Sequence, residues 1–200
     1  IRTAAHAWRN TLDGLGASVI ENEIELQGEA LGILLRGRAD CLLQLQDGSL
    51  LVVDHKKSGT PKRLARLEAG WDLQLGLYRE MLKQPENAGD VLEAALAGNP
   101  KIGVAYHLIN DQGVLLDGLE PPEGIVSVVD GEISLQAMDF LVTRLAEVGA
   151  GLVRLNSEDD RKFFEKTANL VPYALDASPL VLRFMVPGTE SDVGLEGADE

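Results

Sequence analysis

Apolar and polar residues follow two spacings along the first part of the chain, one typical of helices and one typical of strands. Residues 1–13 have helical spacing and are followed by Gly14 and Gly16, which predicts a helix that stops there. Alternating or wholly apolar runs then predict three strands, with Asp47 and Gly48 as a hairpin turn between the second and the third. The expected strands are residues 18–27, 33–46 and 49–56.

The second part of the chain predicts one long helix, two strands and further helices. The long helix is expected over 61–83, with Pro61 near its start and an apolar stripe made of Leu64, Leu67, Trp71, Leu75, Tyr78 and Leu82. The remaining expected elements are a short helix at 90–97, strands at 101–109 and 113–116, a loop at 121–124, and helices at 134–155 and 158–169. This order predicts a mixed α/β fold with a small central sheet.

Composition narrows the class of protein. Two hundred residues suit one globular domain, and a hydrophobic fraction of 45% is enough for a core. The single cysteine, Cys41, excludes an internal disulfide and a four-cysteine zinc or iron–sulfur site within this sequence, and leads us to expect a cytoplasmic location. No apolar run reaches the roughly 18–20 residues of a membrane span. Because the sequence starts at Ile1, we expect a segment of a longer or processed protein.

Asp40, Asp54 and Lys56 lie on the two strands of the predicted hairpin. Side chains alternate along a strand, so Asp54 and Lys56 share a face. A two-residue turn would pair Asp40 with His55 and put Asp54 on the opposite face, whereas a three-residue turn at 46–48 would place Asp40 opposite Asp54. Gly48 favours the three-residue turn, because the last position of that turn is commonly left-handed.

Two opposed carboxylates, with Cβ atoms about 4.5–5.5 Å apart, repel each other unless a cation lies between them. One Mg²⁺ ion, with oxygen ligands at about 2.0–2.1 Å, can bind both carboxylates. The ammonium of Lys56 would then lie beside the metal and could hold a phosphate oxygen or an attacking water. The alternative is a pair of surface aspartates flanking a turn, which fits Asp54 poorly because it ends an apolar run.

These residues belong to three short motifs in which the chain resembles RecB-type PD-(D/E)XK nuclease domains, as in AddB/RecB helicase–nucleases. The motifs are G-x-x-D at 37–40, D-x-K at 54–56 after an apolar strand, and Q-L-x-x-Y at 74–78. They occur in this order within about residues 1–110. The resemblance implies a restriction-endonuclease-like fold, in which helices flank a mixed central sheet.

The resemblance also implies a metal centre. Asp40, Asp54 and the backbone carbonyl of His55 would bind Mg²⁺, with Mn²⁺ as the expected substitute. Lys56 would orient the attacking water or stabilise the transition state. His6, on the first expected helix, would be a further metal ligand, although an exposed polar role suits it equally.

Other residues near the motifs have alternative roles. Glu23 and Glu25 are rivals of the histidine as the additional metal ligand. Gln74 and Tyr78 share a helix face and would position the substrate strand, with a place in the core as the alternative for Tyr78. We expect His107 to be structural.

The motifs together predict a metal-dependent DNA nuclease that hydrolyses phosphodiester bonds without a covalent enzyme intermediate. By the resemblance, it would be the exonuclease domain of a larger helicase–nuclease in DNA repair and recombination. The expected partners are single-stranded DNA and a helicase part of the same or another chain, with no membrane and no iron–sulfur cluster. The alternatives are a catalytically inactive module for DNA binding or subunit assembly, and an α/β domain that is no nuclease.

The expected organisation is one nuclease-like domain over 1–186. Its motif-bearing core would cover 1–110 and a helical remainder 111–186, followed by an acidic flexible tail at 187–200.

The distribution of charge changes what the acidity means. A formal net charge of −14 argues, taken alone, against a nucleic-acid partner, because Lys and Arg make most phosphate contacts. Residues 36–66, however, carry seven basic and three acidic side chains, a net charge of +4. Two of those three acids are the proposed metal ligands. Distant charge is screened beyond about 8–10 Å at ordinary salt, so the acidity does not exclude a nuclease.

Overall fold

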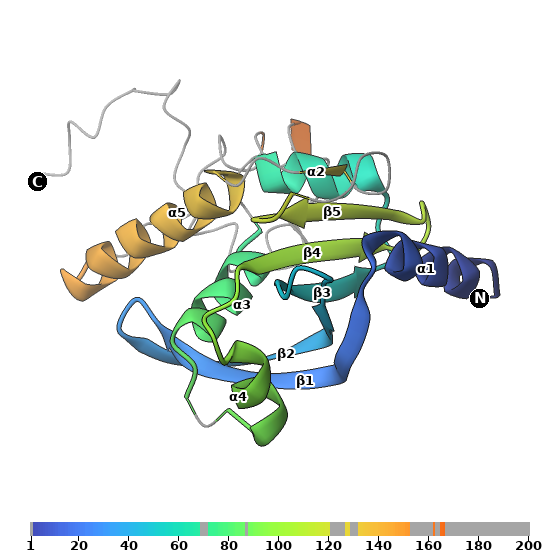
Figure 1. The fold of residues 1–200 in the computed structure, drawn as a ribbon. Helices are drawn as coiled ribbons and strands as arrows, with labels where there is room; N and C mark the ends of the chain where they lie inside the picture. Colours follow the sequence, from blue (N-terminus) through green and yellow to red (C-terminus); the bar gives the residue numbers. More distant parts are fainter. Residues whose placement is uncertain are drawn as a thin grey trace, which may run out of the picture. The chain divides into compact units, whose positions relative to one another are not determined.

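The computed structural model describes residues 2–68, 72–86, 88–120, 127–128, 132–152, 162 and 165–166. Six strands form one sheet in which the spatial order follows the chain order (Figure 1). The strands are β1 (Ser18–Ala30), β2 (Ile33–Gln44), β3 (Leu50–Lys56), β4 (Ile102–Leu108), β5 (Gly113–Asp117) and β6 (Ser127–Val128). The helices are α1 (Arg2–Leu15), α2 (Thr60–Glu68), α3 (Gln74–Lys83), α4 (Asp90–Leu96) and α5 (Glu132–Gly149). The predicted mixed α/β class is confirmed.

The sheet contains both parallel and antiparallel neighbours. Strands β1, β2 and β3 form an antiparallel meander, and β4 then lies parallel to β3. Strand β5 is antiparallel to β4, and the short β6 is parallel to β5. The central position of β3 explains its composition, because the residues from Leu50 to Val53 are all fully buried.

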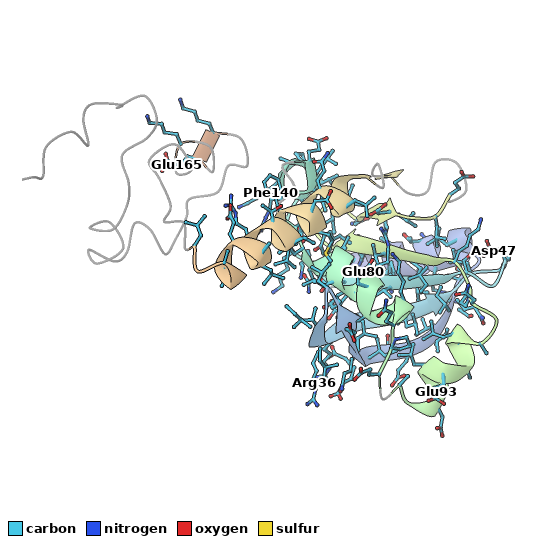
Figure 2. The ribbon with its side chains drawn as sticks, turned by 90° about the vertical axis from the view of Figure 1, so that its left-hand side faces the viewer. Arg36, Asp47, Glu80, Glu93, Phe140 and Glu165 are labelled. Atoms are coloured by element: carbon cyan, nitrogen blue, oxygen red, sulfur yellow. The ribbon has the colours of Figure 1, made fainter. Side chains whose placement is uncertain are left out.

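Apolar side chains of β3 contribute to two separate cores, one on each face of the sheet. Leu50 and Val52 pack with the apolar stripe of α3, whose members are Leu75, Tyr78, Met81 and Leu82. Leu51 and Val53 point the other way and pack with Trp8, Leu12 and Leu15 of α1. The two helices therefore cover opposite faces of the central strand. Charged residues such as Arg36, Asp47 and Glu93 point outward (Figure 2).

The first helix continues through Gly14 to Leu15, two residues beyond its predicted end, and stops at Gly16. Gly16 has a φ of 58°, in the left-handed region that glycine tolerates best. Its N–H donates to the carbonyl of Asp13, and the N–H of Ala17 donates to the carbonyl of Leu12. This is the Schellman arrangement, which satisfies carbonyls at a helix end and turns the chain into β1.

The prediction of one helix over 61–83 is wrong. The structure has two helices, α2 and α3, with Asp72 and Leu73 outside both of them. Asp72 is buried and its carboxylate binds Arg63 and Tyr106, a contact that helical spacing cannot reveal. Gly70 further weakens a continuous helix.

The C-terminal half matches the predictions in part. The helix expected at 134–155 is α5, which ends earlier, at Gly149. The loop at 121–124, the tail at 187–200 and most of the helix expected at 158–169 lie outside the described residues, as does Trp71. The chain divides into two compact units, Ile1–Thr143 and Arg144–Glu200. Among the helices of the described part, none combines the length and apolarity needed to cross a bilayer.

Candidate active site

The turn between β2 and β3 sets which side chains face each other across the hairpin. The N–H of Leu45 donates to the carbonyl of Ser49 at 2.8 Å, and Gly48 has a φ of 84°. The turn therefore has three residues, 46–48, and the left-handed glycine stands at its last position. The pairing continues along the strands to Cys41 opposite Val53. The predicted register is confirmed, and the next position brings Asp40 level with Asp54.

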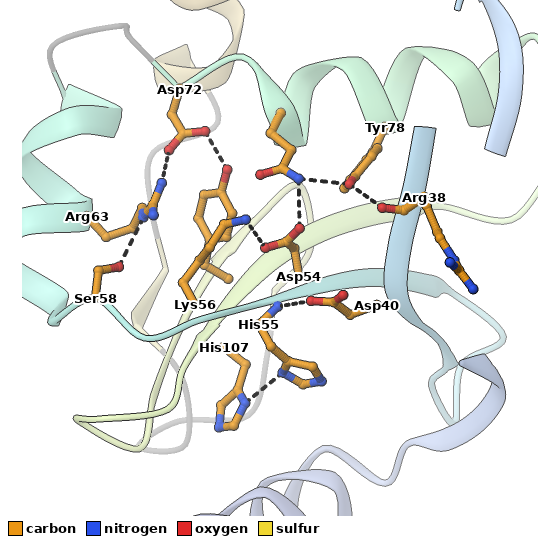
Figure 3. Close-up of polar contacts among 12 residues, drawn as sticks. Arg38, Asp40, Asp54, His55, Lys56, Ser58, Arg63, Asp72, Tyr78 and His107 are labelled. Atoms are coloured by element: carbon orange, nitrogen blue, oxygen red, sulfur yellow. Dashed lines mark hydrogen bonds and ion pairs between the residues drawn. The ribbon is translucent and has the colours of Figure 1, made fainter. Parts of the chain in front are cut away.

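The backbone ladder between β2 and β3 ends just before the two carboxylates. The last paired residues of this ladder are Cys41 and Val53, while β2 continues in register with β1. Beyond that point the N–H of His55 donates to Oδ2 of Asp40 at 2.6 Å, so a side chain replaces the strand partner (Figure 3). The N–H and C=O of a strand residue point to the same side, so the His55 carbonyl also points toward β2.

Asp54 is the buried acid of the site, with 4% of its surface exposed. Lys56 Nζ lies 2.5 Å from Asp54 Oδ2, and Gln74 Nε2 donates to Asp54 Oδ1 at 2.8 Å. Burial raises the pKa of the Asp54 carboxyl, and the hydrogen bond and charge of Lys56 oppose that rise. The carboxylate is thus held between a strand neighbour and a helix (Figure 3).

Gln74 and Tyr78 connect the two strands through α3. The Gln74 amide also donates to the Tyr78 hydroxyl at 2.8 Å, and that hydroxyl donates to the carbonyl of Arg38 at 2.6 Å. Arg38 lies two residues before Asp40 on β2. One hydrogen-bonded chain therefore runs from Asp54 on β3, through one face of α3, to the backbone of β2. Burial raises the pKa of Tyr78, which keeps its hydroxyl protonated and able to donate.

A second buried polar cluster lies beside Asp54, and sequence reasoning missed it. Tyr106 of β4 is level with Asp54 in the parallel ladder, and its hydroxyl donates to Asp72. Arg63 Nη1 donates to Asp72 Oδ2 at 2.6 Å. Lys56 Nζ and the Arg63 guanidinium lie 5.7 and 4.7 Å from the centroid of the Tyr106 ring. The sequence offered one signal of this cluster, because the charged residues at 63 and 72 lie next to members of the apolar stripe of the predicted helix.

On the opposite face of the sheet, aromatic rings pack behind His55. Its Nδ1 lies 2.9 Å from Nδ1 of His107, and the Trp8 ring contacts both imidazoles. His107 is 3% exposed, and burial lowers its pKa to about 4, with the nearby His55 adding to the effect. His107 is therefore neutral at physiological pH, and its ring packs against the ring of His55.

The other suggested metal ligands do not complete a three-residue metal site with the two aspartates among the described residues. His6 is exposed on α1, and Glu23 forms an exposed ion pair with Arg38 at 3.1 Å. Within the described ranges, no group of three or more His, Cys, Asp or Glu side chains is placed to hold a metal ion. None of His6, Glu23 and Glu25 therefore joins the aspartate pair as a third metal ligand in the part of the chain that the structure describes.

The donors that do come together suit one kind of metal ion. Asp40 and Asp54 offer carboxylate oxygens, and the His55 carbonyl points to the same side as the Asp40 contact. A hard ion such as Mg²⁺ binds one or two carboxylates and keeps several waters, so it fits this set. A structural zinc ion would need four nitrogen or sulfur ligands, which these oxygens do not supply.

Comparison with known proteins agrees with this geometry. The family model described as the PD-(D/E)XK nuclease superfamily matches residues 2–177, a range that contains every motif residue discussed above. None of the curated proteins matches the sequence. The mixed sheet with flanking helices is consistent with the restriction-endonuclease-like fold of this family. The chain therefore belongs to the PD-(D/E)XK nuclease superfamily, whose members are nucleic-acid hydrolases that generally use divalent metal ions.

Proposed function

We propose that this chain is a RecB-type, metal-dependent DNA nuclease domain. The proposal rests on one observation: the residues of all three motifs, separated by up to 38 positions from Asp40 to Tyr78, meet at the end of β3. A nuclease-like module without chemistry would not need a buried carboxylate paired with a lysine beside a second carboxylate. The cost of that arrangement favours activity over a purely structural role.

The metal centre that we propose consists of Asp40, Asp54 and the His55 carbonyl. Mg²⁺ is the expected ion, with Mn²⁺ as a substitute. When bound, such an ion lowers the pKa of a coordinated water and offsets negative charge at the scissile phosphate. The rise in the pKa of Asp54 on burial fits a site in which a second positive charge joins Lys56.

Each remaining motif residue has a defined task in this proposal. Lys56 holds a phosphate oxygen or the attacking water, because its ammonium already lies at the Asp54 carboxylate. Gln74 donates to one carboxylate oxygen and so fixes the rotation of Asp54. Tyr78 holds the Gln74 amide in place and anchors it to β2.

We further propose a biological context. The RecB-type motifs favour the exonuclease part of a cytoplasmic helicase–nuclease that acts on single-stranded DNA in repair and recombination. The acidity of the chain supports a division of labour, in which another part of a larger protein delivers the strand.

The test is a cleavage assay on the purified chain with DNA and RNA labelled at either end, in Mg²⁺, Mn²⁺ or EDTA. We expect metal-dependent cleavage of DNA that Asp54→Asn lowers by at least about 100-fold. Asp47→Asn is the matched control, since Asp47 is an exposed aspartate in the same hairpin. Equal cleavage by the wild type and Asp54→Asn would assign the activity to a contaminant. Cleavage of RNA alone would overturn the DNA assignment.

A further inference from the structure

Helix α2 begins four residues after Lys56 and stays attached to the site. Its Arg63 shares the ring of Tyr106 with Lys56, at 4.7 Å from the guanidinium and 5.7 Å from the ammonium to the ring centroid. Arg63 is buried and engaged with Asp72. The helix is therefore held, through Arg63, beside the Tyr106 ring that also contacts Lys56 of the site.

Three cations around this helix form what we call the α2 basic surface, made of Lys57, Lys62 and Arg66. The lysines are exposed and Arg66 is half-buried. None of the three forms an ion pair with another residue of the described part of the chain. Four other surface cations have an acidic partner, in the pairs Arg9–Asp13, Arg38–Glu23, Lys83–Glu80 and Arg144–Glu147.

The helix also aligns two of these cations. Lys62 and Arg66 are four residues apart, so they share a helix face and lie about 6 Å apart along the axis. Arg66 Nε is buried and has no hydrogen-bond partner among the residues that the structure describes. This nitrogen is therefore a donor for which the described residues supply no acceptor.

The competing basic surface is less suited to a polyanion. Arg36 and Arg38 lie on the exposed part of β2, but Arg38 is opposite Glu25 in the β1–β2 register and paired with Glu23. Glu23 and Glu25 therefore offset the charge of Arg38, whereas residues 56–66 carry five basic side chains and no acidic one.

We propose that the α2 basic surface binds the phosphate backbone of the nucleic-acid strand whose scissile phosphate lies at Lys56. The inference rests on the proposed nuclease function and names the part of the molecule that holds the substrate. Lys62 and Arg66 contact neighbouring phosphates, and Lys57 continues the surface toward the site. These contacts are independent of base identity, so they contribute affinity without sequence preference.

The experiment measures the salt dependence of binding. A labelled oligothymidylate is titrated with the wild type and with the α2 variant Lys62→Gln/Arg66→Gln, in EDTA so that metal-dependent cleavage stops. The control variant is Arg9→Gln/Lys101→Gln, which removes the same charge elsewhere on the chain. For two lost phosphate contacts, the slope of log K against log salt decreases in magnitude by about 1.4 in the α2 variant. A change no larger than that of the control overturns the proposal. Lys57→Gln/Lys62→Gln, in which both side chains are exposed, repeats the test if Arg66 is needed for folding.

A kinetic measurement separates this proposal from the function on which it rests. In Mg²⁺ the α2 variant raises KM severalfold and leaves kcat close to wild type. A loss of kcat with an unchanged salt slope overturns the α2 assignment and leaves the nuclease proposal intact. If the wild type cleaves nothing in any metal and the salt slope still decreases, the nuclease proposal fails and the binding surface stands.

Discussion

Arg63 and Asp72 form a buried ion pair beside the site, and replacing Arg63 with methionine measures how strongly the structure depends on it. The two charged groups are 2.6 Å apart, and their side chains are 10% and 6% exposed. Methionine keeps much of the apolar volume but leaves the Asp72 carboxylate buried with only the Tyr106 hydroxyl among its described donors. A buried charge that loses its partner typically destabilises a protein by about 3–5 kcal/mol. We expect Arg63→Met to lower the free energy of unfolding by that amount.

The double variant Arg63→Met/Asp72→Asn shows whether the unpaired charge is the cause. Asparagine is neutral and still offers an oxygen to the Tyr106 hydroxyl. We expect the double variant to be more stable than Arg63→Met by at least about 2 kcal/mol, because it no longer buries an unpaired charge. Urea unfolding followed by circular dichroism supplies both free energies. If the double variant is as unstable as the single variant, or more so, the loss comes from packing and the electrostatic reasoning is refuted.

Two further predictions concern the contacts around this site. A Cβ on Gly28 would lie 2.3 Å from the carbonyl oxygen of Met81 and 2.6 Å from that of Gln84, so Gly28→Ala pushes α3 away from β1. This substitution should lower the free energy of unfolding by at least about 1–3 kcal/mol, measured by thermal unfolding, and should weaken cleavage. The control is Gly89→Ala, which should be neutral because a Cβ there meets nothing within 4 Å. Equal melting temperatures of the two variants would contradict the packing argument. The pKa of His107 is about 4 in the folded chain against an ordinary value of 6.5, so the unfolded chain takes up the proton first as the pH falls. The free energy of unfolding should therefore decrease by up to about 3 kcal/mol as the pH falls from 6.5 to about 4. His107→Asn should reduce this dependence on pH, whereas the exposed control His6→Asn should keep it. The same dependence in the wild type and in His107→Asn would show that another group titrates.

The sequence predicted those parts of the site that depend on local spacing. Gly48 indicated the turn, the turn set the register, and the register brought Asp40 level with Asp54. The four-residue separation of Gln74 and Tyr78 likewise predicted a shared helix face, and the structure joins them by a hydrogen bond. Each of these inferences uses residues that a single turn or helix connects.

The contacts that sequence reasoning missed join residues with no such connection. Tyr106 lies beside Asp54 because β4 is the parallel neighbour of β3, and no spacing rule reveals strand order across 52 residues. The same pairing brings His107 against His55. Asp72 leaves the helical path to reach Arg63 and Tyr106, and this tertiary contact overrides the apolar periodicity that predicted an unbroken helix.

The three-residue turn at 46–48 also determines how the chain tolerates insertions and deletions. Both strands of the hairpin bury apolar side chains on both faces of the sheet, at Leu42 and Leu43 of β2 and at Leu51 to Val53 of β3. A shift of their pairing by one residue would therefore still bury apolar side chains. Such a slip would preserve an apolar core and yet turn Asp40 away from Asp54. The turn lies about 20 Å along the strand from the carboxylates. The length of this surface turn therefore determines whether the two acids face each other. Insertions or deletions in the turn should reduce cleavage as much as substitutions of the acids themselves.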